Sequence, residues 1–320
     1  MADRPTILVT GVGAVIGYGI IKSLRQAKQP VRIIGMDIYA DAYGRSLVDE
    51  FVQAVPAASE AYLPFVQKVV ADHKVDLIIP GIEADLYALW RHKGSIATQI
   101  VLNTDRAIDL SRSKLETARF FAEQPYVIPT LQAVGYTECV ARLGLPFIMK
   151  LVSSHASKGL QVIADAGAFD FHVARAGVKN CVYQRRIGSD DDEYTVGAFG
   201  DGTGTYVDSI ILRRRLSQDG STGKAWFVAD DAAIRSTVDS VFKLLSPVGP
   251  TNVQLRKQDG VAYLLEINPR ISSACSIRTH MGYNEPEMCV RYFLGKETLR
   301  PTVKRPGSVV RFLDDHFVEG

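Results

Sequence analysis

The first hundred residues alternate short apolar runs with stretches in which apolar residues recur every three or four positions. Each apolar run is bounded by glycine or polar residues, which predicts buried strands. The periodic stretches between them, such as residues 60–72 and 83–90, predict amphipathic helices. Strands that alternate with helices indicate a parallel sheet with crossover helices. The predicted strands cover residues 6–9, 31–36, 77–79 and 99–102.

Beyond residue 105 the pattern changes, because most predicted strands follow one another without a long helix between them. Neighbouring strands of this kind indicate hairpins and an α+β arrangement. The helices predicted in this part cover residues 111–123, 137–142, 230–245 and 284–292. The predicted strands cover residues 146–152, 161–163, 181–187, 194–199, 207–212, 251–256, 263–268 and, as an edge strand, 307–313.

The hairpin near the C-terminus carries the clearest chemistry, in the sequence LLEINPR of residues 264–270. Side chains alternate between the two faces of a strand. This alternation predicts a core face made of Tyr263, Leu265 and Ile267. Glu266 and Asn268, with Arg270 if the extended path continues, would lie on the opposite face. A carboxylate, an amide oxygen and a guanidinium on one face suit a divalent metal such as Mg²⁺ and a phosphate group.

The register of this hairpin depends on its turn. A two-residue turn at residues 259–260 would put Gln254 on the core face, opposite Leu265. A three-residue loop would pair Gln254 with Leu264 and place it on the face of Glu266. We favour the second register because it adds a third oxygen donor to the metal face. The alternative is an ordinary hairpin with a polar, solvated face.

The first predicted strand runs into a glycine-rich turn, GxGxxxG, formed by Gly11, Gly13 and Gly17. This spacing is one residue longer than the dinucleotide fingerprint, and Asp37 stands where that fingerprint places a ribose-binding acid. NAD binding is therefore an alternative, but we favour a substrate anion at the helix N-terminus. At the start of a later helix, Glu83 either complements the helix dipole or contacts a substrate amine.

Three further groups of residues could contact an anion. Lys114 lies in the first turn of a predicted helix, where a cation is electrostatically unfavourable, so it either meets a ligand or is simply an exposed lysine, which is the more frequent case. Residues 153–159 form a small polar loop that offers backbone N–H groups and Lys158 to a polyphosphate, although the Walker spacing is absent. The arginines at 213–215 form either a solvated face or a clamp for a phosphate or carboxylate.

Composition narrows the classes of function. The chain has 320 residues, 47% hydrophobic and 22% charged, which is ordinary for a globular protein and allows two domains. A net charge of +2 gives no broad positive surface for nucleic acid or an anionic membrane. The four cysteines lack metal-binding or CxxC spacing, and no apolar run approaches a membrane span or a secretory segment. We therefore expect a reduced, cytoplasmic protein.

The order of these features along the chain resembles the ATP-grasp superfamily, and more narrowly the group related to the large chain of carbamoyl-phosphate synthase. The resemblance covers nearly the whole chain and is sharpest in SRSKLET, PFIMKLVSSHASKGL and NVQL…YLLEINPRISSA. It implies an N-terminal parallel α/β domain, Rossmann-like and of pre-ATP-grasp type, followed by an α+β ATP-grasp domain with two subdomains. The implied boundaries are 1–108 for the first domain, 109–182 for the small subdomain and 183–320 for the large subdomain.

The resemblance also implies roles for individual residues. Contacts with ATP are implied for Lys114, Lys150, the loop residues Ser153, Ser157, Lys158 and Gly159, the connector residues Gln184, Arg185 and Ile187, and Glu193 near the ribose. The implied ligands of Mg²⁺ or Mn²⁺ are Gln254, Glu266 and Asn268. The residues implied to hold the transferred phosphoryl group are Lys150, Lys158 and Arg270. Two positions depart from the family pattern, which usually has a glutamate where this chain has Gln184-Arg185 and often an acid at Gly197.

The activity implied by the resemblance is an ATP-dependent ligation of a carboxylate to an amine through an acyl phosphate, with release of ADP and phosphate. Substrate contacts are expected from Gly11, Gly13, Glu83, Arg213, Arg215, Arg270 and Ser272. The expected partners are small-molecule carboxylates and amines rather than nucleic acid or membranes, with a homodimer as an open option. The alternatives are an ATP-dependent phosphotransferase on the same fold and, further away, an NAD-dependent dehydrogenase.

Overall fold

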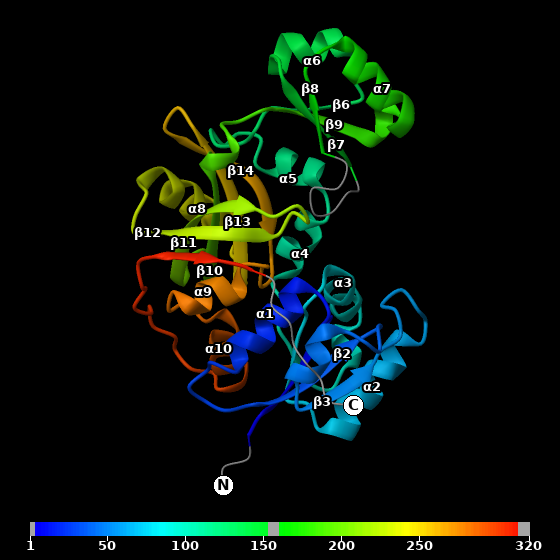
Figure 1. The fold of residues 1–320 in the computed structure, drawn as a ribbon, viewed down its shortest axis with the longest axis vertical. Helices are drawn as coiled ribbons and strands as arrows, with labels where there is room; N and C mark the ends of the chain where they lie inside the picture. The colour runs from blue at the N-terminus through cyan, green and yellow to red at the C-terminus, as the bar shows by residue number, and fades with distance from the viewer. Residues whose placement is uncertain (1–3, 153–159, 313–320) are drawn as a thin grey trace.

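The computed structural model describes residues 4–152 and 160–312. Three sheets form its framework, and helices pack against each of them (Figure 1). In Figure 1 the N-terminal sheet lies at the lower right, the largest sheet at the left, and the smallest in the lobe at the top. Among the described residues, no helix is both long enough and apolar enough to cross a membrane.

The N-terminal sheet has five parallel strands in the order β3-β2-β1-β4-β5, as the alternating pattern predicted. Its strands are β1 (Thr6–Thr10), β2 (Arg32–Asp37), β3 (Glu50–Gln53), β4 (Leu77–Ile79) and β5 (Gln99–Ile100). The helices are α1 (Val15–Leu24), α2 (Tyr62–His73) and α3 (Glu83–Arg91), with 3₁₀ turns at Tyr43–Leu47 and Lys93–Ser95. Strand order reverses between β1 and β4, so the loops after these two strands open a crevice at the carboxyl edge.

The smallest sheet has four strands in the order β6-β9-β7-β8, all of them antiparallel. This lobe contains β6 (Thr130–Gln132), α6 (Tyr136–Leu143), β7 (Phe147–Leu151), β8 (Gln161–Ile163), α7 (Ala166–Ala176), a 3₁₀ turn at Val178–Asn180 and β9 (Cys181–Arg185). Before it come α4 (Asp105–Ser111) and α5 (Lys114–Phe120). The lobe encloses an apolar core of its own, drawn from these strands and from α6 and α7.

The largest sheet has six strands in the order β14-β13-β10-β11-β12-β15. They are β10 (Glu193–Asp201), β11 (Tyr206–Leu216), β12 (Thr222–Val228), β13 (Val248–Gln258), β14 (Val261–Asn268) and β15 (Ser308–Val310), the predicted edge strand. The associated helices are α8 (Ala232–Leu245), α9 (Cys275–His280), α10 (Glu285–Cys289) and a π-helical turn at Val290–Leu294, with a 3₁₀ turn at Asp190–Asp192. Helix α8 covers one face of this sheet, and α9 and α10 lie on the other.

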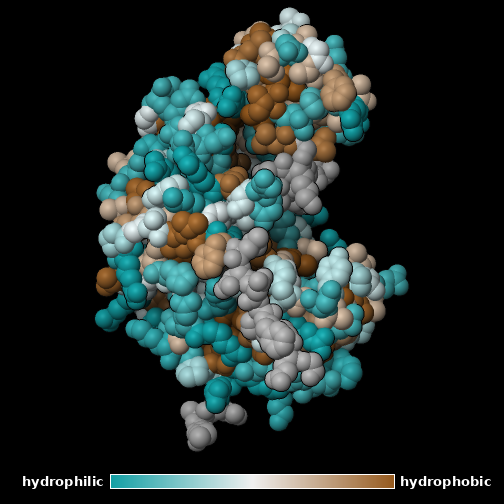
Figure 2. Space-filling model, in the orientation of Figure 1, coloured by the Kyte–Doolittle hydropathy of each residue, from teal (hydrophilic) through white to brown (hydrophobic). Residues whose placement is uncertain are grey.

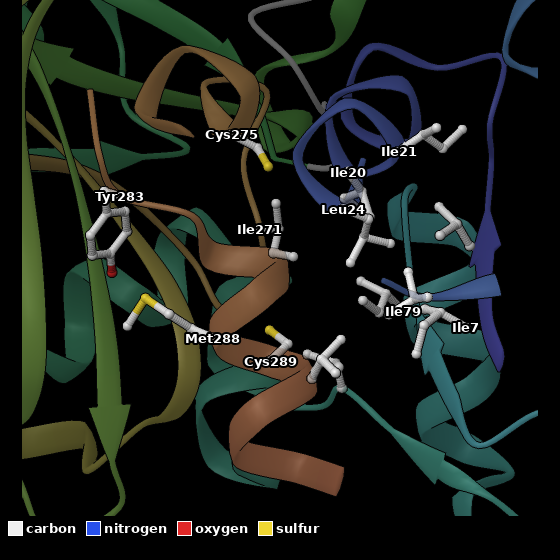
Figure 3. Packing of buried hydrophobic residues seen from close by; sticks show 14 of the residues in the cluster. Ile7, Ile20, Ile21, Leu24, Ile79, Ile271, Cys275, Tyr283, Met288 and Cys289 are labelled. Atoms are coloured by element: carbon white, nitrogen blue, oxygen red, sulfur yellow. The ribbon is translucent and has the colours of Figure 1, made fainter. Parts of the chain in front are cut away.

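Helix α1 packs between the N-terminal sheet and the C-terminal helices. Its apolar side chains share one buried cluster with residues from both parts of the chain (Figure 3). The cluster includes Ile7, Ile20, Ile21, Leu24, Ile79, Ile271, Cys275, Met288 and Cys289. Because apolar burial is the main stabilising force in folding, this shared core fixes the parallel sheet against the largest sheet.

Some elements differ from the sequence prediction. The predicted helix 111–123 is shorter, because α5 covers only Lys114–Phe120, and Ser113 caps it by accepting a hydrogen bond from the backbone N–H of Glu116 at 3.2 Å. Helices α4, α7 and α9 and strands β3, β6 and β12 were not predicted. The boundaries at residues 108 and 182 stay a prediction, and α4 and β9 extend across them.

The hairpin of β13 and β14 has a different register from the favoured one. Gln258 pairs with Val261, so Asp259 and Gly260 form a two-residue turn. Both have positive φ angles, 49° and 77°, which is the backbone twist that two-residue hairpins prefer. The predicted three-residue loop is therefore wrong.

A β-bulge reverses the effect of this shorter turn. Leu255 pairs with Leu264 while Gln254 pairs with Glu266, so Leu265 is the extra residue on its strand. The predicted pairing of Gln254 with Leu264 is wrong. Gln254 nevertheless lies on the face of Glu266, as we expected, because the bulge shifts the alternation by one position.

The bulge also changes which residues of β14 reach the core. Ala262, Leu264 and Ile267 are buried in the cluster under α8. Tyr263 and Leu265 were predicted to be core residues, but both are only half-buried and lie outside that cluster. Leu265 instead lines a cavity of about 860 Å³.

Leu264→Ala should lower the free energy of unfolding by about 2–5 kcal/mol, because it leaves a void in the core under α8. Leu265→Ala is the matched control and should cost about 1 kcal/mol or less, since that side chain is half-buried at the cavity. Urea unfolding followed by circular dichroism measures both. A larger loss for Leu265→Ala than for Leu264→Ala would contradict the bulged register.

Candidate active site

A cavity of about 860 Å³ lies where the three sheets approach one another. Figure 2 shows the surface indented between the lobe at the top and the N-terminal sheet at the lower right. The first turns of α1 and α3, the strands of the small lobe, and β10, β11, β13 and β14 form its walls. The predicted site residues that line it are Glu83, Lys114, Lys150, Gln184, Arg185, Ile187, Glu193, Arg215, Gln254, Glu266, Asn268, Arg270 and Ser272.

Oxygen donors reach this cavity from the C-terminal hairpin. Glu266 and Asn268 lie on β14, with Gln254 directly across from Glu266 and Asn252 across from Asn268. Asn268 Oδ1 accepts a hydrogen bond from Arg270 Nη2 at 3.1 Å. One carboxylate with neutral amide oxygens fits Mg²⁺ when nucleotide phosphates complete its coordination shell. In the described part of the chain, no group of three His, Cys, Asp or Glu side chains offers another metal site.

Lys150 enters the cavity from β7. Its Nζ donates a hydrogen bond to Gln184 Oε1 at 2.7 Å. The pKa of Lys150 is lowered to about 8, mainly by burial and next by the charge of nearby Lys114, while Glu266 opposes the shift. Lys150 and Lys114 both line the cavity. The two lysines thus form one side of the cavity. An anionic ligand bound there would stabilise the protonated form of Lys150.

Gln184, one of the departures from the family pattern, is held on two sides. Its Oε1 accepts from Lys150, and its Nε2 donates to Thr130 Oγ1 at 2.9 Å. A glutamate would lose the second of these bonds, because a carboxylate has no donor. Of the other connector residues, the side chain of Arg185 is exposed and Ile187 is buried, and both line the cavity. The polar partners of this chain therefore account for a glutamine here.

Glu193 is the centre of a buried charge network. Arg214 pairs with Glu193 Oε1 at 2.7 Å, and Arg256 pairs with Oε2 at 2.6 Å. Burial by itself would raise the pKa of Glu193, but the guanidinium groups of Arg214 and Arg256 outweigh it and hold the pKa below its usual value. Both carboxylate oxygens are engaged, so the implied contact with a ribose stays a prediction.

Arg214 belongs to the arginine run predicted as a possible clamp, but only Arg213 and Arg215 were predicted individually to contact substrate. Strand β11 continues to Leu216, so the three arginines alternate between its faces, and Arg214 is the buried one. Arg213 lies over the ring of Trp226, 4.9 Å from its centroid, and is not among the residues that line the cavity. Arg215 reaches the cavity and pairs with Asp191 at 2.6 Å. A longer predicted strand would have revealed this alternation.

Arg270 connects the hairpin to the N-terminal part of the chain. Its Nη2 pairs with Oε1 of Glu83, the first residue of α3, at 2.8 Å. Ser272 lies close by in the sequence and is buried at the cavity wall. This end of the cavity therefore brings a cation, a carboxylate and a hydroxyl together.

The glycine-rich turn contributes differently from the prediction. Gly11 and Gly13 do not line the cavity, whereas the residues that follow them, 14–16, do. Asp37 accepts from the N–H of Gly13 at 2.8 Å through Oδ2 and from the N–H of Tyr39 at 3.0 Å through Oδ1. Each oxygen of Asp37 thus already accepts a backbone hydrogen bond, one from the glycine-rich turn and one from the residues after β2, which weakens the case for a ribose contact and for NAD. The predicted ligands Ser153, Ser157, Lys158 and Gly159 lie outside the described residues.

Comparison with known proteins supports the family resemblance. Residues 190–316 match the family described as ATP-grasp in the biosynthetic pathway with Ter operon. The structure of N5-carboxyaminoimidazole synthetase from Staphylococcus aureus, complexed with ADP, is similar over 98% of this chain and 83% of its own, with a TM-score of 0.78 and 16% identity. The chain has the ATP-grasp fold.

Sequence relatives point to the same group. The chain is 26% identical to formate-dependent phosphoribosylglycinamide formyltransferase of Rhodococcus jostii, over 96% of this chain and 79% of the relative. It is 25% identical to the large chain of carbamoyl phosphate synthase of Halobacterium salinarum, over 54% of this chain but only 18% of that longer protein. The resemblance to ATP-grasp proteins and to carbamoyl-phosphate synthase is confirmed.

Gly197, the second departure from the ATP-grasp pattern, makes room for Arg278. A Cβ atom at position 197 would lie 2.5 Å from Arg278 Nη1, far inside van der Waals contact. Arg278 is fully buried, pairs with Glu285 at 3.1 Å and donates to Thr195 Oγ1 at 3.0 Å. An acid at position 197 is therefore incompatible with the arginine that fills this space.

Gly197→Ala should lower the free energy of unfolding by about 1–3 kcal/mol, because the methyl group displaces a buried ion pair. Gly94→Ala is the matched control, since an added Cβ there meets nothing within 4 Å. It should change stability by about 0.5 kcal/mol or less. Thermal and urea unfolding measure the stability of both variants. An equal loss of unfolding free energy in the two would refute the packing role of Gly197.

Proposed function

We propose that this protein is an ATP- and Mg²⁺-dependent ligase that joins a carboxylate to an amine through an acyl phosphate and releases ADP and phosphate. The observation that carries the proposal is the cavity in which Lys114 and Lys150 share space with Glu266 and Asn268. The ATP-grasp fold supports it. So does the relative named a formate-dependent formyltransferase, because formate is a carboxylate.

The small lobe would bind the adenine. The part of the cavity that the small lobe forms is lined by apolar side chains, those of Ile128, Ile148, Leu160 and Val162. Such a wall suits the flat faces of a purine, and backbone groups of the connector 184–187 would recognise its polar edge. Glu193, which also lines the cavity and pairs with two arginines, would lie near the ribose.

The phosphates would lie between the lysines and the hairpin. Lys114 and Lys150 neutralise their charge, and Arg270 would hold the transferred phosphoryl group in line. Glu266 and Asn268, with Gln254 opposite, are the oxygen donors that would hold Mg²⁺. A bound Mg²⁺ neutralises charge on the phosphate oxygens during transfer. The predicted loop residues, Lys158 among them, would add contacts to the triphosphate.

The proposed reaction has two steps. An oxygen of the substrate carboxylate attacks the γ-phosphorus, and the bond from that phosphorus to the β–γ bridging oxygen breaks, so that ADP leaves. The amine nitrogen then attacks the acyl carbon, the carbon–oxygen bond to phosphate breaks, and the amine proton passes to solvent or to the leaving phosphate. No side chain needs to become covalently modified, so the chain's contribution is position, charge and exclusion of water.

The acceptor substrates would bind at the other end of the cavity. The first turns of α1 and α3 line this end together with Ser272 and the Arg270–Glu83 pair. Backbone N–H groups at a helix N-terminus attract a negatively charged group, and Glu83 would attract an amine. Arg215 at the rim would attract a second anion, whereas Gly11, Gly13 and Arg213 would act from outside the cavity wall.

A phosphotransferase would use the same nucleotide end and stop after the first step, but no contact in the described residues favours it over a ligase. We also propose a cytoplasmic location, because the four cysteines are all unpaired and buried. A homodimer is our proposal for the assembly.

The test of the ligase proposal is ADP and phosphate release from Mg·ATP across a panel of small carboxylates crossed with a panel of amines. Release that requires both partners, together with formation of an amide, supports a ligase. ADP release with a single substrate that becomes stably phosphorylated would instead make the protein a kinase.

Glu266→Gln should lower kcat by at least about 100-fold, because it removes the single carboxylate among the proposed metal ligands. The fold should survive, since the residue lies at the cavity wall. Steady-state ADP formation measures the effect, with Glu138→Gln, an exposed residue of α6, as the matched control. Near-normal turnover in Glu266→Gln would remove the proposed metal site.

Nucleotide affinity should fall as the pH rises through about 8, because Lys150 loses its proton there when the cavity is empty. Only the charged amine attracts phosphate, so Kd for ATP should be about tenfold weaker at pH 9 than at pH 7. Isothermal titration calorimetry across this range measures the change. Lys150→Arg keeps its charge and should flatten the profile, and an unchanged slope in that variant would argue against Lys150 as the titrating group.

A further inference from the structure

The oxygen of Gln254 is turned toward an arginine rather than into open space. Arg214 Nη2 donates a hydrogen bond to Gln254 Oε1 at 2.8 Å. A guanidinium group has donors and no acceptor, so the amide can only present its oxygen to it. The single Gln254 atom that could bind a metal is therefore already engaged by a positive charge.

Asn268 Oδ1 also accepts from an arginine, Arg270, but at the longer distance of 3.1 Å. The side chains of Arg270 and its partner Glu83 are 14% and 28% exposed, against 6% and 7% for Arg214 and Glu193. Arg270 can therefore turn to a phosphate group and release Asn268, whereas Arg214 is fixed.

Arg214 cannot easily leave this position. Its Nε and Nη2 donate to Glu193 Oε1 at 3.1 and 2.7 Å, and its Nη1 lies 3.4 Å from Thr222 Oγ1. The residue is only 5% exposed. Moving the guanidinium away would strip a buried carboxylate of one of its two cationic partners, which is costly in a low-dielectric interior.

The charges around the hairpin also argue against a second metal ion beside Gln254. Glu266 is the single carboxylate among the three proposed ligands, because Gln254 and Asn268 are neutral amides. Its charge acts on both Arg214 and Lys150. Glu193 and Glu83 also line the cavity, but each already pairs with arginine. Two divalent cations would therefore share a single carboxylate ligand beside these fixed positive charges, whereas one cation would have Glu266 to itself.

We propose that this protein holds a single divalent cation, on Glu266 and Asn268, and that Arg214 supplies beside Gln254 the fixed positive charge that a second metal ion would otherwise provide. Gln254 is then a positioning residue that anchors Arg214, not a metal ligand. This inference rests on the proposed function, because it concerns the same nucleotide site. Of the three metal ligands predicted from the sequence, it keeps two.

The test counts metal ions instead of turnover. Mn²⁺ is titrated into the protein saturated with an ATP analogue whose β–γ bridge is nitrogen, and free Mn²⁺ is followed by electron paramagnetic resonance. The wild-type complex should bind one Mn²⁺ per chain. Gln254→Met should bind it within about threefold of the wild-type affinity, whereas Glu266→Gln should weaken it by about tenfold or more.

A charge exchange provides the complementary experiment. Gln254→Glu alone should still bind one Mn²⁺, because the new carboxylate pairs with Arg214. Arg214→Met combined with Gln254→Glu should admit a second Mn²⁺, visible as broadening of the bound signal by the neighbouring ion. Circular dichroism checks folding, and if the double variant does not fold, the comparison of Gln254→Met with Glu266→Gln still decides.

Two Mn²⁺ ions in the wild-type complex, or a loss in Gln254→Met as large as that in Glu266→Gln, would overturn the single-metal proposal while leaving the nucleotide site in place. A wild-type protein that binds neither nucleotide nor Mn²⁺ would overturn the proposed function together with it. The two failures are therefore distinguishable in one series of titrations.

Discussion

The bulge at Leu265 is the constraint on which the cavity depends. The Asp259-Gly260 turn fixes a two-residue hairpin, and strict alternation from such a turn would point Gln254 and Glu266 to opposite faces. The one extra residue lets the hairpin keep its two-residue turn. It also keeps the apolar side chains in the core and the oxygen donors together on the opposite face. Apolar side chains on one side of the hairpin and oxygen donors on the other are consequences of that single irregularity, in keeping with the frequent occurrence of bulges beside active sites.

Charge at the cavity is organised before any ligand arrives. Glu193 is enclosed by two arginines, and Arg270 pairs with Glu83. Each pair is held inside or at the edge of the protein, where a lost partner would leave an uncompensated charge. Such fixed dipoles and charges need little rearrangement when a polyphosphate binds, which is the property that favours electrostatic stabilisation of transferred phosphoryl groups.

Much of the architecture could be predicted because it follows from the spacing of apolar and polar residues over short stretches of sequence. Alternating apolar runs and helical stretches gave the parallel sheet, and residues 77–79 and 161–163 were predicted at their observed bounds. The site residues on β7, β9, β10 and β14 could be found from motif order. The hairpin register could not, since turn and bulge compensate each other, and neither could Arg214, whose face depends on how far β11 extends. The space around Gly197 is set by Arg278, a residue 81 positions away that no local pattern connects to it.

The apolar cluster around α1 also determines how the chain can be divided. Removing the N-terminal sheet would expose Ile271 and Cys275, so it is not a detachable module even though it precedes the ATP-grasp motifs in the sequence. The small lobe is different, because its core is built from its own residues and because β6 and β9, where the chain enters and leaves, are hydrogen-bonded neighbours. With its entry and exit side by side, this lobe has the topology of an insertion, and it is a segment that could be transplanted between related proteins as a unit.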